Sequence, residues 1–160
     1  MNSKKLFIWG FLFVSVIGSL LHFVYEWSGN NSIVRLFAPW NESTWEHMKL
    51  LFFPMLVLVL FLFFKLPEQS PIPVALSIGT LVGLALIPIL FYTYTGVLGF
   101  SVMAIDIAIF YISVLGIFLT GWFLKDNRKL ANRNGLLLTC LVILAILFFI
   151  FSYYPPEIGL

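Results

Sequence analysis

The only two histidines in the sequence lie close to glutamates. His22 is followed by Glu26, and His47 is preceded by Glu42 and Glu46. In a helix, the i, i+4 spacing of His22 and Glu26 places both side chains on one face, one turn apart. Imidazole and carboxylate ligands of this kind suit zinc, manganese or iron. The pattern therefore predicts a divalent-metal site, such as a zinc site, and its predicted ligands are His22, Glu26, Glu42 and His47.

Simpler explanations exist for some of these residues. The run Ser43-Thr44-Trp45-Glu46 fits a capping box, in which the serine hydroxyl and the glutamate satisfy N–H groups at a helix start. His22 and Glu26 could form a hydrogen bond with no further role, because buried polar groups need partners in any case. The spacing also lacks the HExxH pattern of metalloproteases. The metal-site hypothesis and these local explanations both stay open.

Four further residues could do catalytic work at such a site. We predict that Glu46 or Asp106 acts as a general base, and that Tyr94 or Asn41 polarises an oxyanion. Asp106 is the most unusual of them, since it is expected roughly 12 Å inside a helix that crosses the membrane, where an ionisable residue is a functional candidate. The alternative is an aspartate that ties two helices together by hydrogen bonds. Tyr94 belongs to FYTYTGVLG, which we predict to be a turn.

The elements that carry these residues follow from the composition. Of the 160 residues, 61% are hydrophobic, 18% aromatic and 10% charged, whereas soluble domains have about 25% charged residues. Apolar runs of about 20 residues cross a hydrocarbon core of roughly 30 Å as helices. A soluble helical bundle would need a charged face on each helix, which these runs cannot supply. The chain is therefore predicted to be an all-α, polytopic transmembrane helical bundle.

Five such runs are visible, and we predict that they form a single transmembrane domain over residues 1–160. The expected spans are 6–25, 48–64, 74–92, 99–124 and 135–154. The first run is too long for a signal peptide and lacks an A-x-A cleavage site, so we expect it to be retained.

The distribution of Lys and Arg predicts the orientation. Seven of the nine basic residues flank the predicted inner ends of the spans, and two, Arg35 and Lys49, fall on the other side. By the positive-inside rule the N-terminus is predicted inside and the C-terminus outside. The histidines and glutamates would then face the extracytoplasmic side of a multi-pass protein of the cell membrane.

The partners follow from the same composition. The bilayer is the main expected partner, and a lipid-like molecule is the expected substrate of an outward-facing site. The net charge of +2 is too small to indicate nucleic acid binding. Cys140 is the only cysteine, which excludes an intrachain disulfide. A homo-oligomer stays open, because a second copy could complete a polar path through the membrane.

The segments LHFVYEW, NESTWEHMKLLFFP, YTYTGVLG and AIDIAIF resemble a family of small bacterial integral membrane proteins of unknown function, which has a similar NES-x-WEH segment and YTYTG turn. The likeness covers about residues 21–110. It implies a shared site, to which His22, Glu26, Asn41, Glu42, Ser43, Trp45, Glu46, His47, Tyr94 and Asp106 would belong. It implies no activity. A looser similarity links the mixture of residue types to the alkaline ceramidases, which have more spans and another motif order.

Three functions are compatible with these observations. The first is a metal-dependent membrane hydrolase acting on a lipid-like substrate. The second is a carrier of an ion or small molecule that uses Asp106, although five spans show no inverted repeat. The third is a non-catalytic membrane module or partner-binding subunit, whose polar residues only cap and connect helices. Whether the protein is an enzyme stays open at this stage.

Overall fold

The computed structural model describes residues 2–154 and confirms the all-α fold. Its long helices are α1 (Ser3–Trp27), α2 (Thr44–Lys65), α3 (Ile72–Leu98), α4 (Met103–Leu124) and α5 (Asn134–Tyr153). Two short 3-10 helices lie in the loops, η1 (Val34–Leu36) and η2 (Arg128–Arg133). Each of the five long helices is apolar and long enough to cross a membrane.

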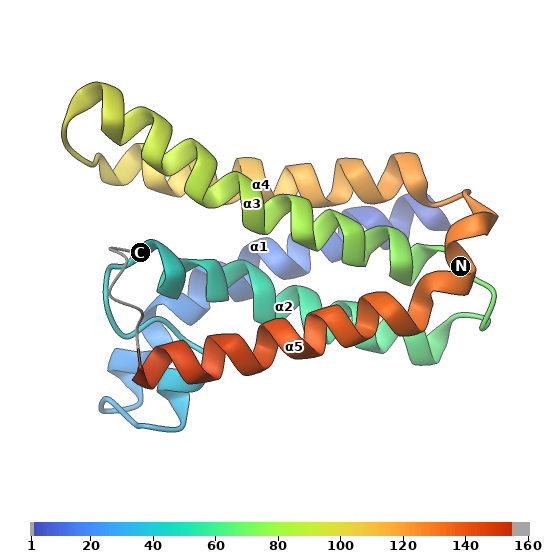
Figure 1. The fold of residues 1–160 in the computed structure, drawn as a ribbon, viewed down its shortest axis with the longest axis horizontal. Helices are drawn as coiled ribbons and strands as arrows, with labels where there is room; N and C mark the ends of the chain where they lie inside the picture. The colour runs from blue at the N-terminus through green and yellow to red at the C-terminus, as the bar shows by residue number, and fades with distance from the viewer. Residues whose placement is uncertain (1, 155–160) are drawn as a thin grey trace.

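The five helices lie roughly side by side (Figure 1). The start of α1 and the end of α5 lie at opposite ends of the bundle. Helices α3 and α4 form the most extensive contact, and α2 packs against α1 and α3. We call the end with the first turn of α1 and with η2 the basic end. The opposite end, which carries His22, His47 and the turn between α3 and α4, is called the histidine end.

Small residues let α3 and α4 approach closely. A Cβ atom built on Gly79 would lie 2.4 Å from the carbonyl oxygen of Ile117, and one on Gly83 would lie 2.5 Å from the Ile117 side chain. Such backbone contact is typical of membrane helices, where small residues rather than the hydrophobic effect permit tight packing. It fixes the α3–α4 hairpin, which carries Tyr94 and Asp106.

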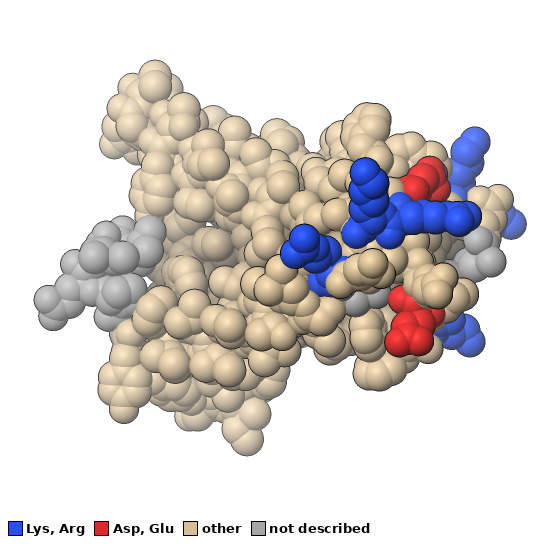
Figure 2. Space-filling model, turned by 45° about the vertical axis from the view of Figure 1, so that its right-hand side comes forward, with Lys and Arg blue, Asp and Glu red and all other residues tan. Residues whose placement is uncertain are grey.

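The surface has the distribution that a bilayer requires. Large apolar side chains are exposed along the helices, for example Trp9, Phe61 and Ile112. On the face shown in Figure 2, the charged side chains of the described residues gather toward the basic end, and the tan surface holds the uncharged ones. Lipid would cover the apolar middle, while the charged end would lie in water.

Two predictions about the α3–α4 hairpin were wrong. The YTYTG segment is helical, because α3 continues to Leu98 and ends at Gly99, whose φ of 79° suits glycine. The hydroxyls of Thr93 and Thr95 donate to the carbonyl oxygens four residues earlier, which is compatible with the helix. Helix α4 starts only at Met103, so Asp106 lies in its first turn and not about eight residues inside a span.

Candidate metal centre

His22, Glu42 and His47 come together at the histidine end. His22 lies toward the end of α1, Glu42 in the loop before α2 and His47 in the first turn of α2. The two imidazole rings have centroids 5.3 Å apart. One nitrogen of each ring and one oxygen of the carboxylate all lie within 4.8 Å of one another. Three of the four predicted metal ligands therefore share one location.

The start of α2 determines where Glu42 and His47 lie. Ser43 is the N-cap, and its hydroxyl accepts from the N–H of Glu46 at 3.3 Å. The N–H of Ser43 donates to the side-chain oxygen of Asn41 at 3.0 Å, which closes a tight turn just before the helix. Asn41 therefore shapes the loop. The capping box is only half formed, because the Glu46 carboxylate accepts from the N–H of Trp40 at 3.4 Å.

The hydrogen bond of His47 orients its ring. Nδ1 lies 3.0 Å from the carbonyl oxygen of Ser43. A carbonyl oxygen can only accept, so Nδ1 carries the proton and donates it. The other nitrogen, Nε2, lies 3.4 Å from Oε2 of Glu42, and in the neutral ring with Nδ1 protonated it is the nitrogen whose lone pair can bind a metal. Histidines that bind metals are commonly held in this way, with the second nitrogen donating to a carbonyl group.

His22 contributes a nitrogen that has no partner. Its Nδ1 is buried, and no group within residues 2–154 forms a hydrogen bond with it. A buried polar atom without a partner is costly, so such atoms in native structures call for an explanation. A cation held by Nδ1 of His22 and by His47 would supply the missing interaction.

The separations suit a zinc-sized ion after small movements. Two ligand atoms that each lie about 2.1 Å from zinc at a tetrahedral angle are roughly 3.4 Å apart. The distance between Oε2 of Glu42 and Nε2 of His47 is already 3.4 Å. The ligand atoms of all three residues are spread more widely, within 4.8 Å of one another. The Glu42 side chain is 87% exposed and can rotate. The residues therefore fit a site with two imidazoles and one carboxylate, which leaves one tetrahedral position open.

The other predicted site residues lie outside this group. Glu26, the fourth predicted ligand, is exposed near the end of α1. The Tyr94 hydroxyl donates to the carboxylate of Asp106 and accepts from the N–H of Val102 at 3.1 Å, so this pair joins α3 to α4. The geometry of the Tyr94–Asp106 pair matches the alternative stated in the sequence prediction, in which Asp106 ties two helices together by hydrogen bonds.

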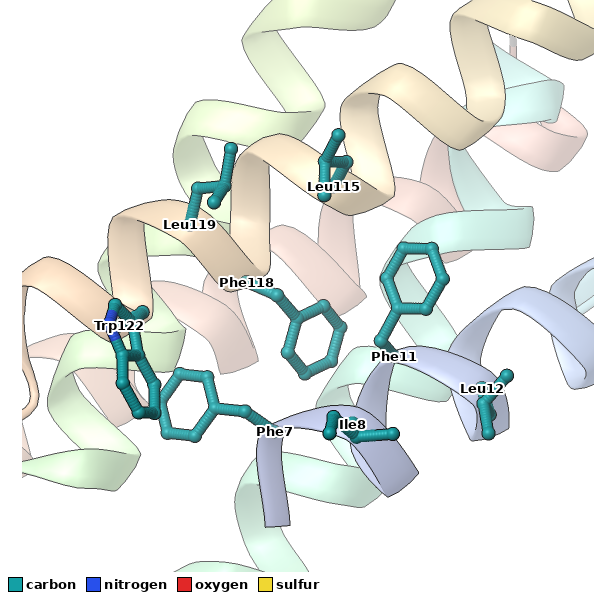
Figure 3. Close-up of a pocket in the computed structure, with 8 residues that line it drawn as sticks. All are labelled: Phe7, Ile8, Phe11, Leu12, Leu115, Phe118, Leu119 and Trp122. Atoms are coloured by element: carbon teal, nitrogen blue, oxygen red, sulfur yellow. The ribbon is translucent and has the colours of Figure 1, made fainter. Parts of the chain in front are cut away.

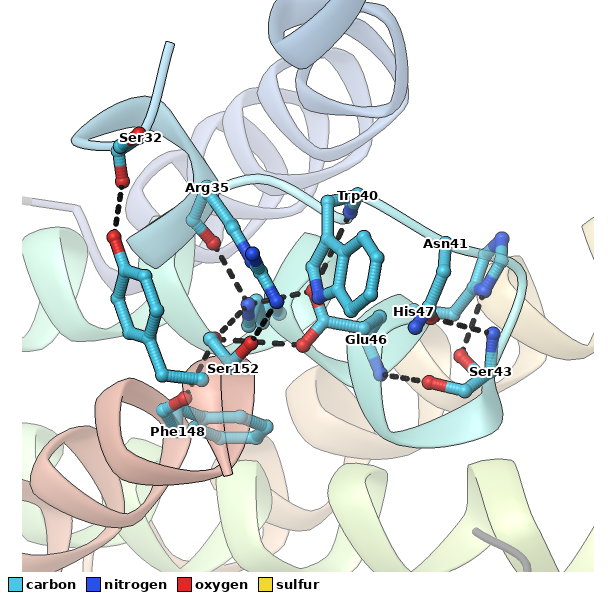
Figure 4. A network of polar contacts seen from close by, with 11 residues as sticks. Ser32, Arg35, Trp40, Asn41, Ser43, Glu46, His47, Phe148 and Ser152 are labelled. Atoms are coloured by element: carbon cyan, nitrogen blue, oxygen red, sulfur yellow. Dashed lines mark hydrogen bonds and ion pairs between the residues drawn. The ribbon is translucent and has the colours of Figure 1, made fainter. Parts of the chain in front are cut away.

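Glu46 belongs to a second polar cluster (Figure 4). Its Oε2 lies 2.6 Å from Nζ of Lys49, and both side chains are buried. Lys49 also donates to the carbonyl oxygen of Arg35 at 2.9 Å and to the hydroxyl of Ser152 on α5. These contacts satisfy the three N–H donors of the ammonium group. Glu46 is thus already engaged with a buried cation.

Arg35 attaches the loop before α2 to the end of α5. Its guanidinium donates to the carbonyl oxygen of Ser152 and lies 3.8 Å from the ring centroid of Trp40 and 4.9 Å from that of Tyr153. The Tyr153 hydroxyl in turn donates to the carbonyl oxygen of Ser32 at 2.8 Å. Both basic residues that depart from the positive-inside pattern, Arg35 and Lys49, therefore have specific structural partners at the histidine end.

Neither Lys49 nor Ser152 was among the predicted site residues. A signal for Lys49 was present, since it follows Glu46 by three residues and such residues are neighbours on a helix. No comparable signal marked Ser152, which lies 103 residues from Lys49. Only the packing of α5 against the start of α2 reveals this contact.

One comparison with known proteins gave a result. The model of a family of unknown function, DUF6512, matches residues 1–160. Neither the curated proteins nor the solved structures contain a match to the chain.

Proposed function

We propose that this chain, which belongs to the DUF6512 family, binds a divalent transition metal through His22, Glu42 and His47 and uses it to hydrolyse a lipid-like substrate. One observation carries the proposal, namely that donor atoms of these three residues lie within 4.8 Å of one another. Zinc is the ion that best suits two imidazoles and one carboxylate.

Three protein ligands favour a catalytic over a structural role for the ion. Structural zinc sites commonly have four protein ligands, whereas catalytic sites keep one position for water or substrate. A bound zinc ion would lower the pKa of that water and polarise a carbonyl or phosphoryl oxygen. The exposed Glu42 supports access from solvent to this position.

The general base requires a new assignment. Glu46 is paired with Lys49, and Asp106 accepts from Tyr94, so neither carboxylate is well placed to take a proton from water. Glu26 is exposed and lies one turn along α1 from His22. We assign the base to Glu26, and we leave Asn41 and Tyr94 with positioning roles.

The location supports an amphiphilic substrate. His22 and His47 both lie near the ends of helices that can cross a membrane, so a bound ion would be close to the lipid headgroups. An ester or phosphoester linkage of a lipid lies at this depth, where its carbonyl or phosphoryl group would meet the ion. A soluble substrate would not need a site on the edge of a membrane bundle.

A second candidate function is a non-catalytic membrane module. It is favoured by the contacts of Glu46, Asp106 and Asn41, which all connect helices or shape loops. On this hypothesis His47 would only donate to Ser43, and no ion would bind.

Metal content separates the two candidates. Wild type, His22→Ala, His47→Ala and Glu42→Gln proteins would be purified in mild detergent without chelators and analysed by plasma mass spectrometry. Asp106→Asn is the matched control, because it changes an acid at the same end outside the group. We expect near-stoichiometric zinc, manganese or iron in wild type and control, and strong loss in the histidine variants.

Hydrolysis assays with lipid esters and phospholipids would follow. We expect turnover in wild type that is lost with a chelator and restored by zinc, and that falls in Glu26→Gln while its metal content is unchanged. Wild type without metal, even after incubation with zinc, would overturn the proposal and favour the non-catalytic module.

A further inference from the structure

An apolar groove lies between α1 and α4 in the half of the bundle nearer the basic end (Figure 3). Its volume is about 270 Å³, and its lining has almost no polar surface. Phe7 and Phe118 form a buried floor, whereas Ile8 and Leu119 on the rims are 60% and 48% exposed. The groove is therefore open to the surroundings of the bundle along its length.

Aromatic packing fixes the shape of this groove. The ring of Phe7 meets Phe118 edge to face, with centroids 6.2 Å apart, and meets Trp122 in the same manner at 5.4 Å. A Cβ atom on Gly121 would lie 3.1 Å from the Phe7 ring, so the two helices are close together at this point. Such a preformed groove could hold a hydrocarbon chain without the free-energy cost of rearranging its walls.

Lysines continue both walls at the basic end. On α1, Lys4 precedes Phe7 and Ile8 by three and four residues, and it therefore lies on the same helix face one turn before them. Directly after α4, Lys125 follows Trp122 by three residues, and its Nζ lies 4.5 Å from the centroid of the Trp122 ring. Each of the two helices that line the groove is thus followed toward the basic end by a lysine, Lys4 or Lys125, about one turn from the lining residues.

We propose that this groove binds one acyl chain of an anionic phospholipid, whose phosphate contacts Lys4 and Lys125. The volume is slightly below that of common ligand pockets, about 300–1,000 Å³, so it suits a segment of one chain. Basic side chains next to membrane helices attract anionic lipids on the cytoplasmic side, which is where the positive-inside rule places this end. The site lies at the opposite end from His22 and does not depend on the metal.

One nearby acid reduces the charge at the mouth of the groove. Asp126 is paired with Lys125; the side chain of Lys125 is 15% exposed and that of Asp126 is 84% exposed. A phosphate would share Lys125 with this carboxylate, whereas Lys4 is exposed. We therefore expect a moderate preference for anionic lipid and not an exclusive one.

Native mass spectrometry can measure this preference. Protein released from detergent would be exposed to equal amounts of phosphatidylglycerol and phosphatidylcholine with the same acyl chains. The test protein is the double variant Lys4→Gln, Lys125→Gln. The matched control is the double variant Arg128→Gln, Lys129→Gln, which also removes two positive charges, but from η2. We expect a preference of wild type for phosphatidylglycerol that falls by at least roughly fivefold in the test protein, since one unpaired basic residue contributes about fivefold and Asp126 already offsets part of the charge of Lys125. The preference should persist in the control.

Fluorescence tests the position of the acyl chain. Phosphatidylglycerol with brominated chains quenches tryptophans that it contacts, and the signal of Trp122 is the difference between wild type and Trp122→Phe. We expect strong quenching of this component. Equal binding of both lipids, equal loss in test and control proteins, or an unquenched Trp122 would each overturn the proposal. Dimers that form without lipid and exclude it would assign the groove to a second copy of the chain instead.

Discussion

Lys49 and Glu46 form an ion pair inside the bundle, with Nζ 2.6 Å from Oε2 and side chains that are 0% and 2% exposed. A buried pair is stable only if additional hydrogen bonds satisfy both groups. The Arg35 carbonyl oxygen and the Ser152 hydroxyl provide them for Lys49. The pair therefore holds three segments together, namely the loop before α2, the start of α2 and the end of α5.

Replacement of Glu46 by Gln should strongly destabilise the protein. The change would leave the Lys49 ammonium buried without a carboxylate, a loss that costs roughly 3–5 kcal/mol in other proteins. Thermal unfolding in detergent, followed by tryptophan fluorescence, measures the effect. Glu42→Gln is the matched control, because the same change is made on a side chain that is 87% exposed, and without metal it should unfold almost like wild type. Equal melting temperatures of the two variants would contradict a stabilising role of the pair.

The five long apolar helices could be predicted from the sequence, because length and apolar composition alone indicate them. The ends of α3 and α4 could not. Threonine and glycine near a predicted boundary indicate a turn, yet Thr93 and Thr95 donate to carbonyl oxygens within α3 and the helix continues. The position of Asp106 depended on that boundary, so it was placed too deep.

Part of the candidate metal centre could also be predicted, because the order of the long helices determines which residues share an end of the bundle. Once the spans are known, His22 and His47 must lie at the same end, and the sequence therefore brings the two histidines together. It could not select between Glu26 and Glu42, because the loop before α2 decides which glutamate approaches the rings. The contact of Glu46 with Ser152 also depended on tertiary packing, since Ser152 reaches the Glu46–Lys49 pair from α5.

Loss of the Tyr94 hydroxyl should loosen the turn between α3 and α4. This group donates to Asp106 and accepts from the N–H of Val102, and an unsatisfied partner costs about 1–3 kcal/mol. We expect faster hydrogen exchange across residues 95–105 in Tyr94→Phe, measured by mass spectrometry. Tyr111→Phe is the control, because its hydroxyl contacts Ser19 on α1 and its loss should leave that turn unchanged. The prediction fails if both variants exchange like wild type there.

An alanine at Gly79 should separate α3 from α4. Its Cβ would lie 2.4 Å from the carbonyl oxygen of Ile117, so one backbone must move, at a cost of about 1–3 kcal/mol. Gly96→Ala is the matched control on the same helix, since its added Cβ would lie more than 4 Å from every described atom other than those of its two neighbours and the nearby backbone of α3. The control should be neutral or slightly stabilising, because alanine favours a helix over glycine by about 1 kcal/mol. Equal melting temperatures would show that this close contact does not limit stability.

Zinc should raise the melting temperature of the wild-type protein. An ion that binds only the folded state adds about 2.7 kcal/mol of stability at a concentration 100 times its dissociation constant. Magnesium should have little effect, since it prefers oxygen ligands, and acidification should weaken the zinc effect because protons compete for the imidazole nitrogens. In His22→Gln the shift should disappear. The same shift in this variant, or with magnesium, would mean that the stabilising ion binds elsewhere than beside His22 and His47.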